Sequence, residues 1–513
     1  MTTVFTDLAS GFALLLGNPA ALFFVFLGAF IGIVIGALPG LTAAAAIAML
    51  MPITFYLDPL SALAFLYVIG KSGRYGGSIA AVLFNTPGTA ASAATMIDGH
   101  PMAKKGQAGK ALKISTAASV FGDTFGELVL IFGAASIAVY TARFGPPEYF
   151  AVYVMAFVVI GSVIGSSVTK GLMATAFGAL VAFVGLDPVT ADARLTLGIL
   201  DLESGLQLVP VLIGLFVVSE IMVQVARAED AQMITAEDGK AVDPDGNRLT
   251  WAEFKRCIPV MIRSSGVGTF IGLMPGIGSS VACFVAYGEE RRRAKNKDEW
   301  GTGVIEGVAA PESANNAVSG PSMIPLLTLG VPGSTIAAIL IGVFIVHGIQ
   351  VGPSIFQTSR ELVFGLMAAG LLGIAAYGII GYWGAPLIGR AILLVPNSII
   401  YPFIFMTAFV ASYSTRSSLF DVGVAMVFGI VGYLMRRFDY SPAAFVIAFV
   451  LAKGAEESLR QSLLLSDAGI FIFFERPVAL AFIAAGVLVL IWRAVSNMKT
   501  AAPAPDTSAP RTS

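Results

Sequence analysis

The residues best suited to chemistry are polar groups that interrupt apolar segments. The densest group lies at 312–317, where Glu312, Asn315 and Asn316 closely precede the apolar stretch 324–327. A carboxylate at the centre of a bilayer costs at least about 2.5–3.5 kcal/mol, so at membrane depth it has a functional reason to be there. Such oxygen donors suit a sodium ion, and a glutamate alone suits a proton. An interfacial loop with an ordinary helix cap is the structural alternative.

Four Pro-Gly pairs also interrupt apolar surroundings, at 39–40 and 87–88 in the first half and at 275–276 and 332–333 in the second. Lipid cannot hydrogen-bond a backbone, so a broken helix at membrane depth is tolerated only where it is packed in protein or lines a wet cavity. Paired interruptions in two halves point to the substrate site of a transporter. Four unrelated helix kinks are the alternative.

Polar groups flank the later Pro-Gly pair of each half. They are Asn85, Thr86 and Thr89 in the first half, and Ser334 and Thr335 in the second. Their hydroxyls and amide, together with the free N–H groups at a helix start, would bind a carboxylate. The sequence therefore predicts an anion site at these loops.

Four charged residues in apolar surroundings have more than one interpretation. Lys71 and Arg74 either add positive charge to the anion site or extend to the membrane interface. Asp123 and Glu127 are four residues apart and share one helix face, where they form a proton relay or lie at the wet end of the segment.

Several kinds of chemistry are excluded by missing motifs. The run 70–72 ends like a phosphate-binding loop, but Phe65 stands where that loop needs its first glycine. The chain has two histidines and two cysteines, without the spacing of a metal site. We therefore expect no catalytic residue, no cofactor and no metal beyond a sodium site.

The elements that position these residues must be membrane helices. The chain has 513 residues, of which 56% are hydrophobic and 12% charged, and its mean hydropathy is +0.83. This composition predicts an all-α, polytopic integral membrane protein of roughly 10–12 transmembrane helices. The helices should form two pseudo-repeats with Pro-Gly-broken helices or re-entrant hairpins. The net charge of -1 argues against nucleic-acid binding.

Polar and basic stretches divide the chain. We expect a first membrane half at 1–226, a polar linker at 227–258, a second membrane half at 259–495 and a disordered tail at 496–513. The basic run 291–297 follows an apolar segment directly. By the positive-inside rule this loop is cytoplasmic, and basic residues near the end of the chain place the C-terminus on the same side.

The motifs in this order resemble the large membrane subunit of the tripartite tricarboxylate transporters, a bacterial family. The resemblance covers roughly residues 32–474 and rests on these stretches: 36–41, 75–79, 85–89, 98–99, 275–278, 311–317 and 330–334. It implies uptake of an organic anion, a di- or tricarboxylate, driven by a sodium or proton gradient across the inner membrane. The implied partners are a periplasmic solute-binding protein and a small membrane subunit of about four helices.

Together, the motifs and the resemblance predict two groups of site residues. The expected substrate-binding residues are Pro39, Gly40, Gly76, Gly77, Ser78, Asn85, Thr86, Pro87, Gly88, Thr89, Pro275, Gly276, Gly278, Pro332, Gly333, Ser334 and Thr335. The expected ion-coupling residues are Glu312, Asn315 and Asn316.

Two other functions compete with this prediction. A stand-alone carboxylate permease or a channel would also use broken helices, but would need no partner protein. An integral membrane enzyme would need a histidine or multi-aspartate cluster, which the sequence lacks.

Overall fold

The computed structural model describes residues 2–38, 40–163, 167–227, 247–393, 397–467 and 469–500. These residues are predominantly helical, and the short strands β1 (Gly185–Leu186) and β2 (Ala193–Arg194) pair antiparallel. The helices before the linker are α1 (Thr2–Leu16), α2 (Pro19–Ala37), α3 (Ala43–Leu50), η1 (Met51–Tyr56), α4 (Pro59–Phe84), α5 (Ser92–Lys104), α6 (Ala108–Thr141), α7 (Pro146–Val163), α8 (Val168–Ala182), α9 (Leu200–Glu203), α10 (Leu208–Leu212), η2 (Ile213–Val218) and α11 (Ser219–Arg227).

The second half continues in the same way. Its helices are α12 (Trp251–Leu273), α13 (Gly278–Arg293), η3 (Lys297–Glu299), α14 (Ile305–Ala317), α15 (Met323–Leu329), α16 (Thr335–Val346), α17 (Ile355–Thr358), α18 (Arg360–Leu393), α19 (Asn397–Ser414), α20 (Leu419–Arg437), α21 (Pro442–Leu464), η4 (Gly469–Phe471), α22 (Ile472–Glu475) and α23 (Pro477–Thr500).

Several helices are long and apolar enough to cross a membrane. Five described segments meet this condition: Pro19–Ala37, Ala108–Thr141, Leu208–Ala226, Arg360–Ile392 and Leu419–Arg437. The pair 469–475 and 477–493 is bent by 90° and would form a sixth span. Shorter apolar helices of 10–17 residues accompany them. The prediction of an all-α, polytopic membrane protein is confirmed.

Two of the predicted segment boundaries, after residue 258 and after residue 495, fall inside helices. Residues 228–246 of the predicted linker lie outside the described residues, and 251–258 already belong to α12. Helix α23 continues to Thr500, so it includes the first residues of the segment predicted to be a disordered tail. Residues 501–513 lie outside the described part.

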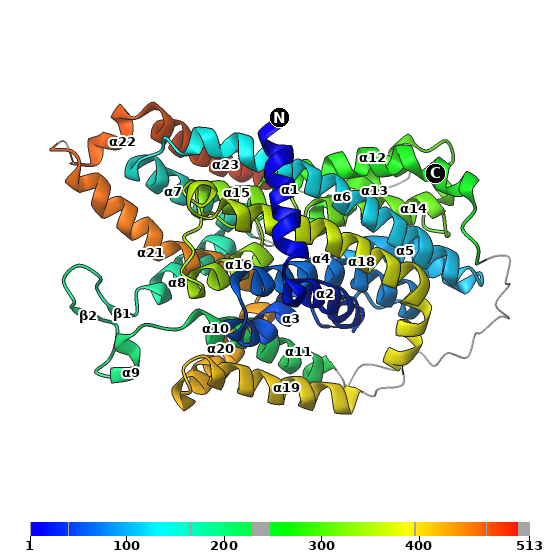
Figure 1. Cartoon of the computed structure of the whole chain (residues 1–513), viewed down its shortest axis with the longest axis horizontal. Helices are drawn as coiled ribbons and strands as arrows, with labels where there is room; N and C mark the ends of the chain where they lie inside the picture. Colours follow the sequence, from blue (N-terminus) through cyan, green and yellow to red (C-terminus); the bar gives the residue numbers. More distant parts are fainter. Residues whose placement is uncertain are drawn as a thin grey trace, which may run out of the picture.

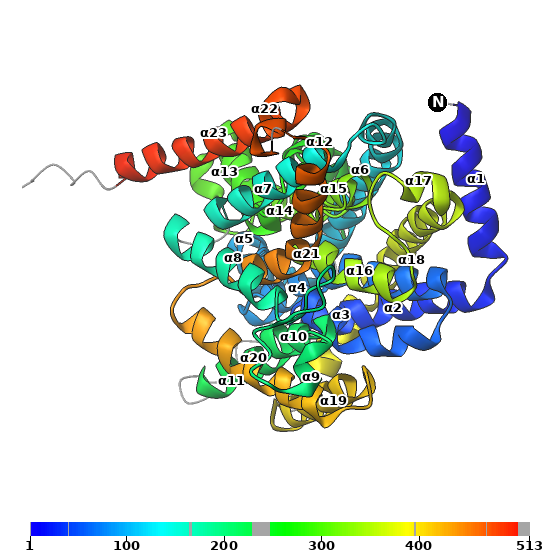
Figure 2. The ribbon, with the colours of Figure 1, turned by 90° about the vertical axis from the view of Figure 1, so that its left-hand side faces the viewer.

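Helix α4 is the centre of the structure. It lies in the interior in both views, whereas α19 lies at the lower edge in both and α1 lies at the right-hand edge in Figure 2 (Figures 1 and 2). Every residue of α4 from Leu60 to Val82 is buried. Glycines let helix α2 pack closely against α4, since a Cβ on Gly36 would lie only 2.2 Å from the carbonyl oxygen of Gly73. Small residues permit this close backbone approach, as is usual between membrane helices.

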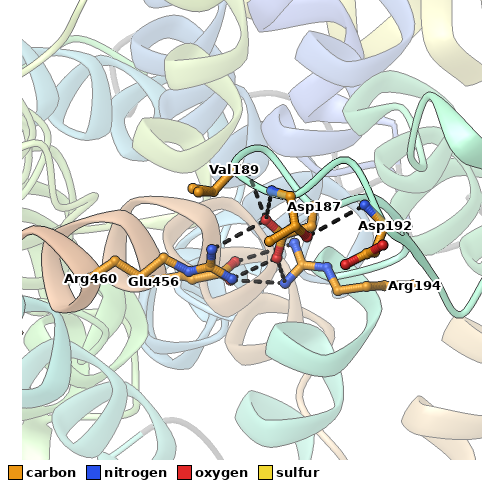
Figure 3. A network of polar contacts seen from close by, with 7 residues as sticks. Asp187, Val189, Asp192, Arg194, Glu456 and Arg460 are labelled. Carbon is orange, nitrogen blue, oxygen red and sulfur yellow. Dashed lines mark hydrogen bonds and ion pairs between the residues drawn. The ribbon is translucent and has the colours of Figure 1, made fainter.

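The connection between α8 and α10 is held onto α21 by ion pairs (Figure 3). Asp187 accepts hydrogen bonds from Arg460 at 2.6 and 3.2 Å and from the backbone N–H of Val189 at 2.8 Å. Arg194 lies 2.8 Å from Glu456 in the same network. The Arg460 guanidinium, followed by the backbone N–H donors, holds the pKa of the Asp187 carboxyl well below its usual range. This connection is therefore anchored by charge as well as by its short β-hairpin.

The lowered pKa of Asp187 predicts how this anchor depends on pH. A carboxyl group with a lowered folded pKa stabilises above its unfolded value of roughly 4, and this contribution is lost as the pH falls. We therefore expect hydrogen exchange of residues 185–199, measured relative to the intrinsic exchange rate at each pH, to accelerate as the pH falls below that value. Asp187→Asn should accelerate it already at pH 7, whereas Asp192→Asn, at an exposed position, should not. Equal exchange in both variants would contradict the anchoring role.

Candidate functional site

The two Pro-Gly interruptions of each half lie close together. In the first half, Gly88 lies against the end of α2, directly before the earlier loop, because a Cβ on Gly88 would lie 2.5 Å from the carbonyl oxygen of Gly36. Its N–H also donates to the carbonyl of Gly77 in α4 at 3.4 Å. In the second half, the N–H of Gly276 donates to the carbonyl of Gly333 at 3.2 Å. The interruptions are therefore spatial pairs, not independent kinks.

All four loops border one cavity of about 390 Å³. The lining residues that belong to these loops or to the first turn of the helix after them are Thr42, Ala43, Ala44, Thr89, Gly276, Ile277, Gly278, Ser279, Ser280, Gly333, Ser334, Thr335 and Ile336. Its other walls are Arg74, Phe216, Asn315, Val318, Arg436, Ala443 and Ile447. The cavity therefore lies between the two halves of the chain.

Three helices begin at this cavity. Thr42 caps α3 and Ser334 caps α16, each by accepting a backbone N–H bond at 3.2 Å. Helix α13 begins at Gly278 without a side-chain cap. Gly278 has φ +80° and nothing within 4 Å of an added Cβ, so it suits the turn and leaves open space. The unpaired N–H groups and positive dipole ends of such helix starts favour an anion.

Six of the predicted substrate-binding residues line the cavity, and ten others that the structure describes do not. Those at the cavity are Thr89, Gly276, Gly278, Gly333, Ser334 and Thr335. Those that do not line it are Gly40, Gly76, Gly77, Ser78, Asn85, Thr86, Pro87, Gly88, Pro275 and Pro332. Pro39 lies outside the described residues.

The predicted residues away from the cavity have other contacts. Asn85, the left-handed C-cap of α4, and the following Thr86 and Pro87 are exposed. Gly76 lies in the close crossing of α4 with α2, where a Cβ would approach the carbonyl oxygen of Ile33 to 2.5 Å. These positions shape the backbone around the cavity.

Sequence reasoning missed three hydroxyl groups in the cavity wall. Thr42, Ser279 and Ser280 follow the first Pro-Gly pair of each half. The prediction considered polar residues around the later pairs only. The same rule, applied to the earlier pairs, would have found all three.

A polar seam joins the two halves where α4 meets α14 and the residues just after it. Ser78 donates to Glu312 at 2.5 Å, Arg74 donates to the carbonyl of Asn315 at 3.4 Å, and the Lys71 ammonium lies 3.5 Å from the Ser319 hydroxyl. Residue numbers fall along α4 as they rise along α14 and the residues after it, so the two segments run antiparallel. The seam therefore aligns three polar pairs beside the cavity.

The predicted ion-coupling residues lie on this seam and are buried. Glu312 accepts hydrogen bonds from Ser78, from Thr95 and, at 2.8 Å, from Ser119. Its carboxylate is thus surrounded by hydroxyl donors from α4, α5 and α6. The side-chain oxygens of Asn315 and Asn316 are buried and have no hydrogen-bond partner within the described structure. Buried acceptors without partners are unusual and call for an explanation.

A second charged group surrounds Lys71, which precedes Ser78 on α4. The Lys71 ammonium is 2.6 Å from Asp123 and 2.8 Å from Glu127, and all three side chains are fully buried. Tyr67 donates to Glu127 at 2.7 Å and Tyr377 to Asp123 at 3.3 Å. Lys71 does not extend to an interface, and neither carboxylate lies at a wet helix end. The group links α4, α6 and α18.

Asp98, from the motif at 98–99, has a structural position. Its carboxylate accepts the backbone N–H groups of Gly301, Gly303 and Val304 at 2.8–2.9 Å, and Tyr287 donates to it at 2.8 Å. It therefore fixes the connection from α13 to α14. Among the described residues, no group of three or more His, Cys, Asp and Glu side chains could hold a metal ion.

The buried lysine gives a stability prediction. Lys71→Met leaves Asp123 and Glu127 buried without a described cation within 4.0 Å, so we expect it to lower the free energy of unfolding by about 3–5 kcal/mol. Combining it with Asp123→Asn and Glu127→Gln removes all the charges and should restore most of that loss. Denaturant unfolding of the purified protein in detergent measures both. A single variant as stable as the wild type would show that the lysine is not needed to balance the carboxylates.

Comparisons with known proteins agree with the geometry. Residues 22–447 match the tripartite tricarboxylate transporter TctA family. An Agrobacterium vitis protein, described as an uncharacterized 52.8 kDa protein in the TAR-I ttuC' 3' region, is 36% identical over 494 residues, or 96% of each chain. A second A. vitis protein, described as an uncharacterized protein in the TAR-II ttuC' 3' region, is 35% identical over 235 residues, which are 45% of this chain and 96% of the relative. No solved structure matches. The chain therefore belongs to the tripartite tricarboxylate transporter TctA family.

Proposed function

We propose that this chain is the large permease subunit of a tripartite secondary transporter that takes up di- or tricarboxylates across the bacterial inner membrane. The observation that carries the proposal is the single cavity bordered by all four Pro-Gly loops. Broken helices whose N-termini face a site between two repeats are typical of secondary transporters that bind anions. Family membership supports the same function.

The proposed partners are a periplasmic solute-binding protein and a small membrane subunit. The chain has no nucleotide-binding loop, so an ion gradient is the proposed energy source. We place the C-terminus in the cytoplasm because basic residues precede it and also follow α13. A channel would use a similar cavity but would not need a binding protein.

Sodium is our proposed coupling ion, with Asn315 and Asn316 supplying ligands. Their side-chain oxygens are buried without donors beside Glu312, and sodium, like other hard cations, prefers oxygen ligands. Asn315 also lines the cavity. A cation at this position would therefore lie close to a bound anion and attract it.

Reconstitution tests the tripartite function. Liposomes with this chain and the small subunit should show little uptake of labelled citrate or succinate until loaded binding protein is added outside. Collapse of the sodium and proton gradients should then stop uptake. Strong gradient-driven uptake by this chain alone would favour a stand-alone permease, and gradient-independent flux that does not saturate would favour a channel.

The sodium site predicts a specific kinetic change. Asn315→Ala and Asn316→Ala should each raise the sodium concentration for half-maximal uptake by about tenfold, as expected when one ligand worth roughly 1.4 kcal/mol is lost. The apparent substrate affinity at saturating sodium should change less. Asn296→Ala, an exposed control position, should keep the wild-type sodium dependence. Wild-type sodium dependence in both site variants would move coupling to Asp123 and Glu127, with the proton as the alternative ion.

A further inference from the structure

We infer that Arg74 binds one carboxylate of the substrate, and that the start of α13 receives a second carboxylate of the same molecule. This inference rests on the proposed function and extends it. It assigns the cavity to small organic anions with at least two carboxylates. The cavity volume of about 390 Å³ is at the lower end of the range for ligand pockets.

Arg74 is the buried cation whose charge the described structure leaves unpaired. The residue is only 9% exposed and lines the cavity. Among the described residues, its guanidinium donates one hydrogen bond, to the carbonyl of Asn315 at 3.4 Å, and its Nε has no partner. No described carboxylate lies within 4.0 Å of it. A guanidinium has five N–H donors and stays charged at physiological pH, so most of its binding capacity is unused.

The neighbouring charged side chains of the described structure form no ion pair with Arg74. Asp123 is occupied by Lys71 at 2.6 Å and by Tyr377 at 3.3 Å. Glu312 is occupied by hydroxyl groups. Arg436, the other cation in the cavity wall, forms an ion pair with Glu220. Lys71 also faces Glu127, so two carboxylates share one lysine and Arg74 balances the charge of the group from a distance. No described carboxylate lies close enough to accept its N–H groups, which leaves these donors available.

An unpaired buried cation is costly, because desolvation of an ion in a protein interior costs several kcal/mol. A carboxylate in the cavity would remove that cost. It would also satisfy the planar N–H fork of arginine, which binds carboxylates through two parallel bonds. Lysine has the same charge but not this geometry, so it should replace Arg74 only in part.

The second carboxylate of the substrate would bind at the start of α13. This helix begins in the cavity wall without a side-chain cap, and Ser279 and Ser280 add hydroxyls in its first turn. A helix start of this kind binds anions through its free N–H groups. Arginine on one wall and the helix start on another would select a dicarboxylate over a monocarboxylate of the same length.

Ligand-induced stabilisation of the purified protein tests the inference without requiring transport. We expect succinate to raise the melting temperature of the wild type, and butyrate, with as many carbons but one carboxylate, to do so far less. Arg74→Gln should weaken the succinate affinity by at least about thirtyfold, the usual effect of removing one partner of a buried charge pair. Arg74→Lys should retain an intermediate affinity. Arg292→Gln, at an exposed position outside the cavity, should behave as the wild type.

The melting temperature without ligand separates a binding role from a structural one. Because Arg74→Gln removes a buried charge that no described carboxylate within 4.0 Å pairs, the ligand-free variant should be about as stable as the wild type. An Arg74→Gln protein that keeps the succinate affinity, or one whose ligand-free form is strongly destabilised and rescued by Arg74→Lys, would overturn the inference. A wild type that neither binds nor transports any carboxylate would instead contradict the proposed function.

Discussion

The interior of a membrane protein has no bulk water to satisfy polar groups, and the structure around α4 depends on this constraint. Over 23 buried residues, from Leu60 to Val82, α4 carries a lysine, an arginine and several hydroxyls. A buried polar group needs a partner, because an unsatisfied group costs several kcal/mol in such surroundings. Lys71, Tyr75 and Ser78 find theirs on α6 and α14. The positions of α6, α14 and α18 around α4 follow from these partners.

Glycine makes this arrangement compatible with close packing. Contacts at Gly36 and Gly73 bring the backbones of α2 and α4 together, and Gly88 brings the later loop against the end of α2. Side chains at these positions would separate the segments. The close approach in turn allows both Pro-Gly loops of one half to reach the same cavity, so packing and site geometry share one cause.

The polar groups of the core fall into two kinds. Lys71 is paired with Asp123 and Glu127, and Glu312 is bonded by hydroxyl groups, so both hold helices in place, although one carboxylate oxygen of Glu127 has no hydrogen-bond partner. Arg74, Asn315 and Asn316 keep atoms without partners, although they are equally enclosed. Buried polar atoms without hydrogen-bond partners occur mainly where a ligand binds to them. The contrast separates the groups that stabilise the fold from those we assign to substrate and ion.

The sequence by itself determined the all-α membrane class, because composition and segment length follow directly from the thickness of a bilayer. It also indicated a site at the Pro-Gly loops, because a broken backbone in lipid needs protein or water around it. Only the tertiary structure decided which flanking residues face the cavity: Thr89 does, but Asn85 and Thr86 are exposed. It also decided that Lys71 is paired and Arg74 is not. These two residues share a helix and lie three positions apart, and the partners that distinguish them come from α6, which no local pattern on α4 can place.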